Sequence, residues 1–235
     1  MFVPLYDGVP LRYLRFPLGN WSIIALNVIV FLAMQTGTED HTGRLETALG
    51  VVPAVVFGTA VLSPELAIVP TPVTLLTGMF VHANVGHILG NMLFLWVFGD
   101  NVEDAMGSVR YVAFYLACGV IAALTFAAMV PTSQSPLIGA SGAISGVAAA
   151  YLLLYPKARI WGFVFVPWLP LRIPASWFVG IWIFLQLVSA FFSETSDIGW
   201  WAHLGGIGAG CALVGVFKRR DVPLFGRRPD PDMPS

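Results

Sequence analysis

Charged side chains are scarce in this chain of 235 residues: Asp, Glu, Lys and Arg together make up 11% of it, whereas 57% is hydrophobic. Since a soluble globular domain carries about 25% charged residues, this composition excludes a soluble enzyme, a disordered chain and a nucleic-acid-binding module. The formal net charge of −1 gives no reason to expect a polyanionic partner. We therefore expect a polytopic membrane protein whose partners include the lipid bilayer and no nucleic acid.

Cysteine and metal-binding motifs are equally scarce. The two cysteines, Cys118 and Cys211, lie in apolar runs, which favours packed thiols over a disulfide framework. The sequence has no His-Glu-x-x-His motif and no pair of intramembrane aspartates, so a zinc protease and an aspartyl protease are excluded. We expect no metal and no cofactor. No small-residue cleavage site follows the first apolar run cleanly, so we expect a retained first span rather than a signal peptide.

Stretches without charge predict six membrane-spanning helices, since one span needs about 20 apolar residues. The stretch Tyr111–Pro156 is long enough for two helices, and Pro131–Pro136 breaks it. The other four predicted helices are Trp21–Thr36, Leu75–Phe98, Ile173–Ser193 and Ile198–Phe217. The expected fold class is an all-α membrane protein, a bundle of six transmembrane helices.

The basic residues predict the orientation of these spans. Six spans put both termini on one side, and all of the 12 Lys and Arg residues except Arg44 then fall on that side. The positive-inside rule makes it the cytoplasmic side. We expect a cytoplasmic arm over residues 1–20, a transmembrane domain over 21–217, and a disordered cytoplasmic tail over 218–235.

The first predicted loop, residues 38–74, is long and still apolar. Its stretch Leu45–Phe57 contains Pro53 and is too short and too broken to span the bilayer. We expect this stretch to lie in the outer membrane interface. A folded external loop is the alternative.

Polar residues at membrane depth are costly, so each needs a reason. They occur in the outer halves of the second, fourth and sixth predicted spans, which all run in the same direction. His87 and Asn91 are four residues apart and share a helix face. Ser141 opens the fourth span between Gly139 and Gly142, which let another backbone come close.

His203 opens the sixth span on the same helix face as Gly206 and Gly210. Gly206-x-x-x-Gly210 is a small-residue packing seam, and if it packs on the fourth span, His203 lies beside Ser141. A serine beside a histidine is the minimal unit of nucleophilic acyl transfer. No Asp or Glu falls inside a span, so we expect a Ser–His dyad oriented by packing.

The second predicted span supplies hydrogen-bond donors. His87 and Asn91 can donate to the oxyanion that develops during acyl transfer. The neighbouring His82 either supports this pair or lies at the membrane interface.

Together these residues resemble the rhomboid family of intramembrane serine proteases over about Trp21–Phe217. The matching motifs are His87 with Asn91, Gly139-Ala-Ser141-Gly142, and His203 with Gly206 and Gly210. The resemblance implies a rhomboid-like six-helix bundle with Ser141 as nucleophile and His203 as general base and acid. It also implies transmembrane protein substrates cut near the outer membrane face, with helix-breaking segments and a small residue at the cleaved bond.

Two positions depart from the family pattern. Many rhomboids carry Trp-Arg where this chain has Val73-Thr74, and some stack a tyrosine on the histidine where this chain has Ser145. An inactive rhomboid-like protein that binds membrane helices is the alternative function, and the intact Ser141 and His203 argue against it. A small transporter is disfavoured because no chain of acids and bases crosses the bilayer. We expect a prokaryotic plasma membrane, the cell inner membrane.

Overall fold

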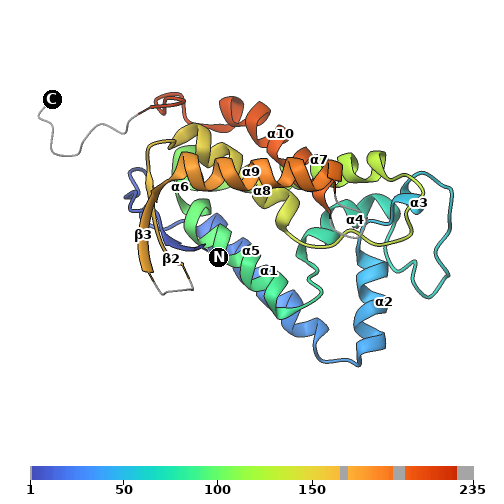
Figure 1. The fold of residues 1–235 in the computed structure, drawn as a ribbon. Coiled ribbons are helices and arrows are strands. Elements are labelled where there is room, and N and C mark those ends of the chain that lie inside the picture. Colours follow the sequence, from blue (N-terminus) through green and yellow to red (C-terminus); the bar gives the residue numbers. More distant parts are fainter. Residues whose placement is uncertain (1, 165–168, 193–198, 227–235) are drawn as a thin grey trace, which may run out of the picture.

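The computed structural model describes residues 2–164, 169–192 and 199–226, which are mostly helical with a small sheet at one end (Figure 1). The helical elements are α1 (Leu18–Met34), α2 (Glu39–Leu49), α3 (Pro53–Val56), α4 (Thr71–Thr77), η1 (Gly78–Phe80), α5 (Val85–Phe94), η2 (Leu95–Gly99), α6 (Asp100–Met106), α7 (Ser108–Met129), α8 (Ser141–Leu154), α9 (Ala175–Phe192) and α10 (Trp200–Phe217). Of these, η1 is a 3-10 turn and η2 is a π-helical segment that joins α5 to α6. The strands are β1 (Phe2–Tyr6), β2 (Arg159–Val164) and β3 (Leu169–Pro174).

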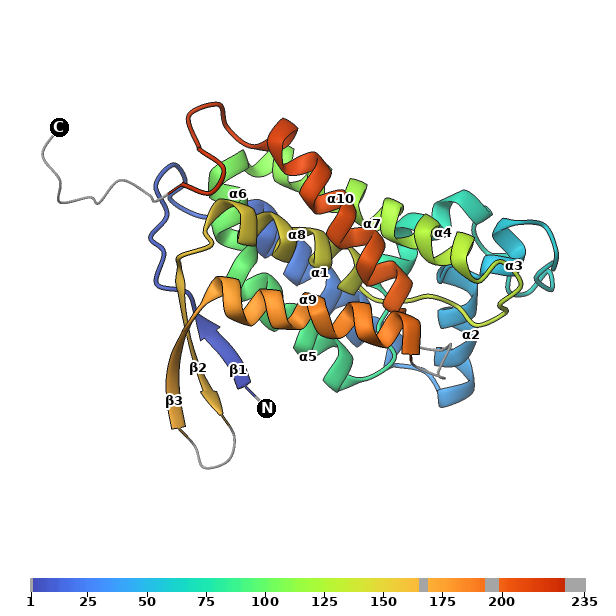
Figure 2. The same cartoon turned by 45° about the horizontal axis from the view of Figure 1, so that its top comes forward.

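Three helices of the described part of the chain, α7, α9 and α10, are long and apolar enough to cross a membrane. The pair Thr71–Phe80 and Val85–Met106 counts as a fourth only when taken together, and it bends by 83° at its break. The helices α1 and α8 are shorter, with 17 and 14 residues. Most of α8 is buried and it lies in the middle of the bundle (Figure 2), so other helices surround it rather than lipid. The count of six spans therefore stays a prediction.

The continuous helix formed by α5, η2 and α6 runs past the charged residues at which the second span was expected to end. Glu103 and Asp104 are fully buried there because their carboxylates bind backbone N–H groups of the N-terminal arm. Glu103 accepts from Gly19 and Asn20 in the first turn of α1, at 2.9 and 2.6 Å. Asp104 accepts from residues 12–14 at 2.7–2.9 Å. Charges are poor markers of a span boundary when hydrogen bonds satisfy them in the interior.

The sheet departs from the all-α expectation. A hairpin of β2 and β3 fills the connection between α8 and α9, and β1 pairs antiparallel with β2. Along β2, exposed Arg159, Trp161 and Phe163 alternate with buried Ile160 and Gly162, the period of two that is typical of a half-buried strand. Spans assigned from the spacing of charges could not reveal this alternation.

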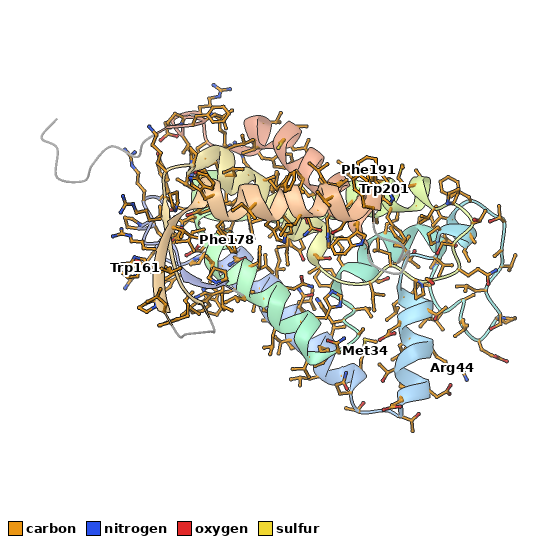
Figure 3. All side chains as sticks on the ribbon, in the orientation of Figure 1. Met34, Arg44, Trp161, Phe178, Phe191 and Trp201 are labelled. Atoms are coloured by element: carbon orange, nitrogen blue, oxygen red, sulfur yellow. The ribbon has the colours of Figure 1, made fainter. Side chains whose placement is uncertain are left out.

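The sheet and α2 lie at opposite ends of the molecule. Figure 3 marks them by Trp161 on β2 and Arg44 on α2. The N-terminal strand β1 belongs to this sheet and so lies far from α2 (Figure 1). Arg44 is thus far from Arg159 and Arg172 of the sheet, and the orientation of the spans stays a prediction.

The long loop between α1 and α4 is folded against the bundle. Val51, Val52 and Ala54 are buried in the protein, and Val51 exchanges two backbone hydrogen bonds with Leu137, of 3.0 and 2.8 Å. These contacts tie the loop to the segment that leads into α8. Phe57 and Val61 of the same loop are exposed, however, so its placement in the membrane interface stays a prediction.

The C-terminal segment is ordered in its first part, which differs from the disordered tail that we expected over 218–235. Val222 is buried, and the N–H of Phe225 donates to the carbonyl oxygen of Leu153 at 2.7 Å. The hydroxyl of Tyr13 donates to Asp221 at 2.6 Å, which lowers the pKa of this carboxyl. Residues 227–235 lie outside the described part of the chain.

Candidate active site

Ser141 is the first residue of α8, and the loop before it is held in place by two glycines. Gly139 has φ +111°, a backbone conformation that side chains rarely adopt, and its N–H donates to the carbonyl oxygen of Gly78 at 2.8 Å. A Cβ at Gly139 would lie 2.6 Å from Nε2 of His87. Glycine at 139 thus lets the start of α8 approach α5 closely.

The helices α8 and α10 meet along the seam that the glycine spacing predicts. A Cβ on Gly206 would run into the carbonyl oxygen of Gly142, and one on Gly210 into that of Gly146. Because of this close packing, the first turn of α10 lies beside the first turn of α8. His203 Nε2 lies there 2.9 Å from Ser141 Oγ, within hydrogen-bonding distance.

Three side chains surround the imidazole ring of His203. Its Nδ1 lies 2.7 Å from Oε1 of Gln186 on α9. The rings of Trp182 and Trp200 lie 6.2 and 5.9 Å from it between centroids. The sequence predicts orientation by packing, which these indoles supply, but it misses the hydrogen-bond partner. Ser145, at the position of the family tyrosine, is buried and donates to the carbonyl oxygen of Ser141 at 2.6 Å.

A signal for Gln186 was available in the sequence. Ala175, Val179 and Gln186 are the buried residues of α9, and their spacing of four and then seven residues puts all three on one helix face. An amide on the inward face of an otherwise apolar membrane helix is costly unless it is paired. At the C-terminal end of the same helix, Phe191 packs edge-to-face on Trp201 of α10 with 5.1 Å between centroids (Figure 3).

His87 and Asn91 lie on the side of α5 that faces Ser141. Asn84 caps α5, because its side chain accepts from the N–H of His87 at 2.9 Å. His82 is fully buried and its Nε2 lies 2.9 Å from Nδ2 of Asn91. This contact fixes one edge of the Asn91 amide, so His82 supports the pair and is not exposed at a membrane interface.

A cavity of about 760 Å³ joins these groups. Its walls include His87 and Asn91 of α5, Ser141 of α8, Gln186 of α9 and His203 of α10. The sequence-predicted residues from three separate helices therefore open into one space. The remaining predicted residues, the glycines, form its supporting backbone contacts.

Glu46 of α2 is the carboxylate among the described residues that line this cavity, and burial raises its pKa. Within the described ranges, His, Cys, Asp and Glu side chains form no group of three that could hold a metal ion. The reactive groups of the site are therefore a hydroxyl beside an imidazole. An amide and a second imidazole face the same cavity. This arrangement suits acyl transfer.

A comparison with protein-family models matches residues 70–220 to the rhomboid domain. The chain belongs to the rhomboid family. The matched region contains every residue of the site described above except Glu46, and it confirms the resemblance seen in the sequence motifs.

Three relatives in curated collections illustrate how far the similarity extends. The presenilin-associated rhomboid-like protein, mitochondrial, of Bos taurus is 29% identical over 204 residues, 83% of this rhomboid chain and 46% of the relative. RHOMBOID-like protein 12, mitochondrial, of Arabidopsis thaliana is 30% identical over 150 residues, 57% of the chain and 43% of the relative. Rhomboid protein 1, mitochondrial, of Saccharomyces cerevisiae is 30% identical over 148 residues, 59% of the chain and 40% of the relative.

Two facts follow from these relatives. The rhomboid chain spans less than half the length of each of them. All three carry mitochondrial names, which contradicts the prediction of a prokaryotic plasma membrane. Composition and basic-residue asymmetry indicate a membrane and an orientation in it, but they do not distinguish one such membrane from another.

Proposed function

We propose that this rhomboid is an intramembrane serine endopeptidase that cleaves transmembrane protein substrates by a Ser–His dyad. Ser141 is the nucleophile and His203 is the general base and acid. The observation that carries the proposal is the contact of 2.9 Å between His203 Nε2 and Ser141 Oγ, inside a cavity that is large enough for an extended peptide segment.

The reaction follows from this geometry. His203 accepts the proton of the Ser141 hydroxyl through Nε2 as Oγ attacks the substrate carbonyl carbon. His87 and Asn91 donate hydrogen bonds to the oxyanion that forms. His203 then returns the proton to the leaving amine, and water hydrolyses the acyl-enzyme by the same steps in reverse order.

The proposed arrangement in the membrane has six spans, with α1 and α8 as the two short ones and both termini on the side that carries the basic residues. The opening of the cavity then lies toward the opposite side. The names of the relatives support a mitochondrial membrane as the location. Substrates are membrane helices with a helix-breaking segment and a small residue at the cleaved bond, because those features let a peptide unwind into the site.

The purified full chain in detergent tests this function with a fluorophosphonate probe and a model transmembrane substrate. The wild-type chain should label and cleave, and Ser141→Ala and His203→Ala should do neither, with thermal unfolding nearly unchanged. Ser145→Ala is the matched control, because that hydroxyl is bonded to a backbone carbonyl and does not line the cavity. Cleavage by Ser141→Ala, or a wild-type chain that neither labels nor cleaves, would refute the protease and favour the helix-binding alternative.

A further inference from the structure

Gln186 is placed where a third member of a catalytic constellation would lie. It comes from α9, whereas His203 and Ser141 come from α10 and α8. Its side chain is 6% exposed, and its amide oxygen lies 2.7 Å from His203 Nδ1, on the side of the ring away from Ser141 Oγ. Both ring nitrogens of His203 therefore have one partner each.

The identities of these partners determine the tautomer of the imidazole. An amide oxygen only accepts, so His203 must carry its proton on Nδ1 when it faces Oε1 of Gln186. The lone pair is then on Nε2, which faces the hydroxyl of Ser141. A general base needs this tautomer, and the opposite one would present an N–H to Ser141 and could not accept its proton.

We propose that Gln186 is a positioning residue that holds His203 in the tautomer and ring orientation required for proton transfer from Ser141. This inference rests on the proposed protease function, and it replaces a dyad held by packing alone with one in which a hydrogen bond to Gln186 orients the histidine. A neutral amide suits this depth in the membrane, because it orients the ring without burying a charge.

The aromatic neighbours of His203 cannot select its tautomer by themselves. Trp182 and Trp200 limit tilting of the ring by contact. A ring flip, however, exchanges Nδ1 and Nε2 with carbon positions at nearly the same shape. Hydrogen bonds distinguish the two ring orientations, and the amide oxygen of Gln186 also selects the tautomer, which the hydroxyl of Ser141 does not, because a hydroxyl can donate or accept.

The test compares two replacements of Gln186 in the full chain, in detergent, with kcat, KM and the pH dependence of kcat measured on one transmembrane substrate. Gln186→Met keeps the length of the side chain and removes the acceptor, so kcat should fall about 10- to 100-fold while KM changes little. Gln186→Glu keeps an oxygen acceptor and should recover most of the activity. Its charge should also move the acid-side midpoint of the pH–kcat profile upward by about one pH unit, because a carboxylate stabilises the imidazolium.

The groups that share the space with His203 are constant in this comparison. Among the described residues, His87 on α5 is the titratable group that acts on His203, and Glu46 on α2 lines the same cavity. Both variants keep these two residues. Leu185→Met is the control: it introduces the same residue one position earlier on α9, where the side chain is 54% exposed, and kcat should not change.

Three results would overturn the inference: a wild-type kcat in Gln186→Met, a Gln186→Glu enzyme as slow as Gln186→Met, or an unshifted pH midpoint in Gln186→Glu. If Gln186→Met does not fold, the pH midpoint of Gln186→Glu decides alone. Failure of the proposed function is distinguishable, because the wild-type chain would then neither label nor cleave, whereas failure of this inference leaves both intact.

Discussion

The replacement Gly206→Ala tests whether the seam between α8 and α10 sets the catalytic distance. The added Cβ would run into the backbone carbonyl of Gly142 and lie 3.1 Å from Cβ of Ser145. A backbone carbonyl in the middle of a contact cannot swing aside, so the two helices must separate by about 1 Å for ordinary contact to be restored. The hydrogen bond of 2.9 Å between Ser141 and His203 lies within one turn of this contact, so the separation breaks it.

The expected effects are large on activity and moderate on stability. A misplacement of about 1 Å between reacting groups costs about 10²-fold in rate. Overpacking of a close contact costs about 1–3 kcal/mol of unfolding free energy. The assay is kcat with a transmembrane substrate, together with thermal unfolding of the same detergent-solubilised sample.

The control is Gly208→Ala, two residues further along α10. A Cβ there meets no atom within 4 Å, so the same chemical change should leave kcat unchanged, and alanine should favour the helix by about 1 kcal/mol. Equal activity of Gly206→Ala and Gly208→Ala would refute the claim that this seam holds Ser141 and His203 together.

Three further predictions concern other parts of the site and its frame. Asn91→Ala should lower kcat by about 10²–10³-fold with little change in KM and still label slowly with fluorophosphonate, whereas full activity would show that this amide only packs. Glu103→Gln replaces one of the two carboxylate oxygens that cap α1 with an amide NH2 group, which cannot accept from a backbone N–H, so thermal unfolding should reveal a loss of about 1.5–3 kcal/mol. An unchanged melting temperature would contradict this capping role. Burial raises the pKa of Glu46, so its ionised form destabilises the fold above the pKa of the unfolded chain; Glu46→Gln should raise Tm relative to wild type near pH 7 and lose that advantage at about pH 3. A Tm difference that does not depend on pH would count against this last effect.

Much of the helix pattern was predictable because helices that contact lipid are long, uncharged and apolar. The predicted end of the last span, Phe217, is the last residue of α10. The predicted end of the fifth span, Ser193, lies outside the described residues. The prediction failed where tertiary contacts change the cost of a charge, as at Glu103, and where a period of two in the β2 segment was concealed in a short connection between helices.

The sequence by itself determined which residues share a helix face and which end of a helix they occupy. Helical periodicity puts His87 beside Asn91 and aligns His203 with Gly206 and Gly210, and small residues mark where two helices approach. These shared faces depend only on the spacing along one helix. The approach of the two helices depends on the two glycines of the seam. Family membership follows from the same residues.

Only the tertiary structure decided which side chain lies on the far side of the histidine. The contact between Gln186 and His203 depends on the rotation of α9 about its axis and on its crossing angle with α10, and neither quantity is encoded in the spacing along one helix. The same holds for Glu103 and the N-terminus of α1, which are more than 80 residues apart in the chain. Spacing along one helix determines its faces, whereas hydrogen bonds between helices form only after packing has brought those faces together.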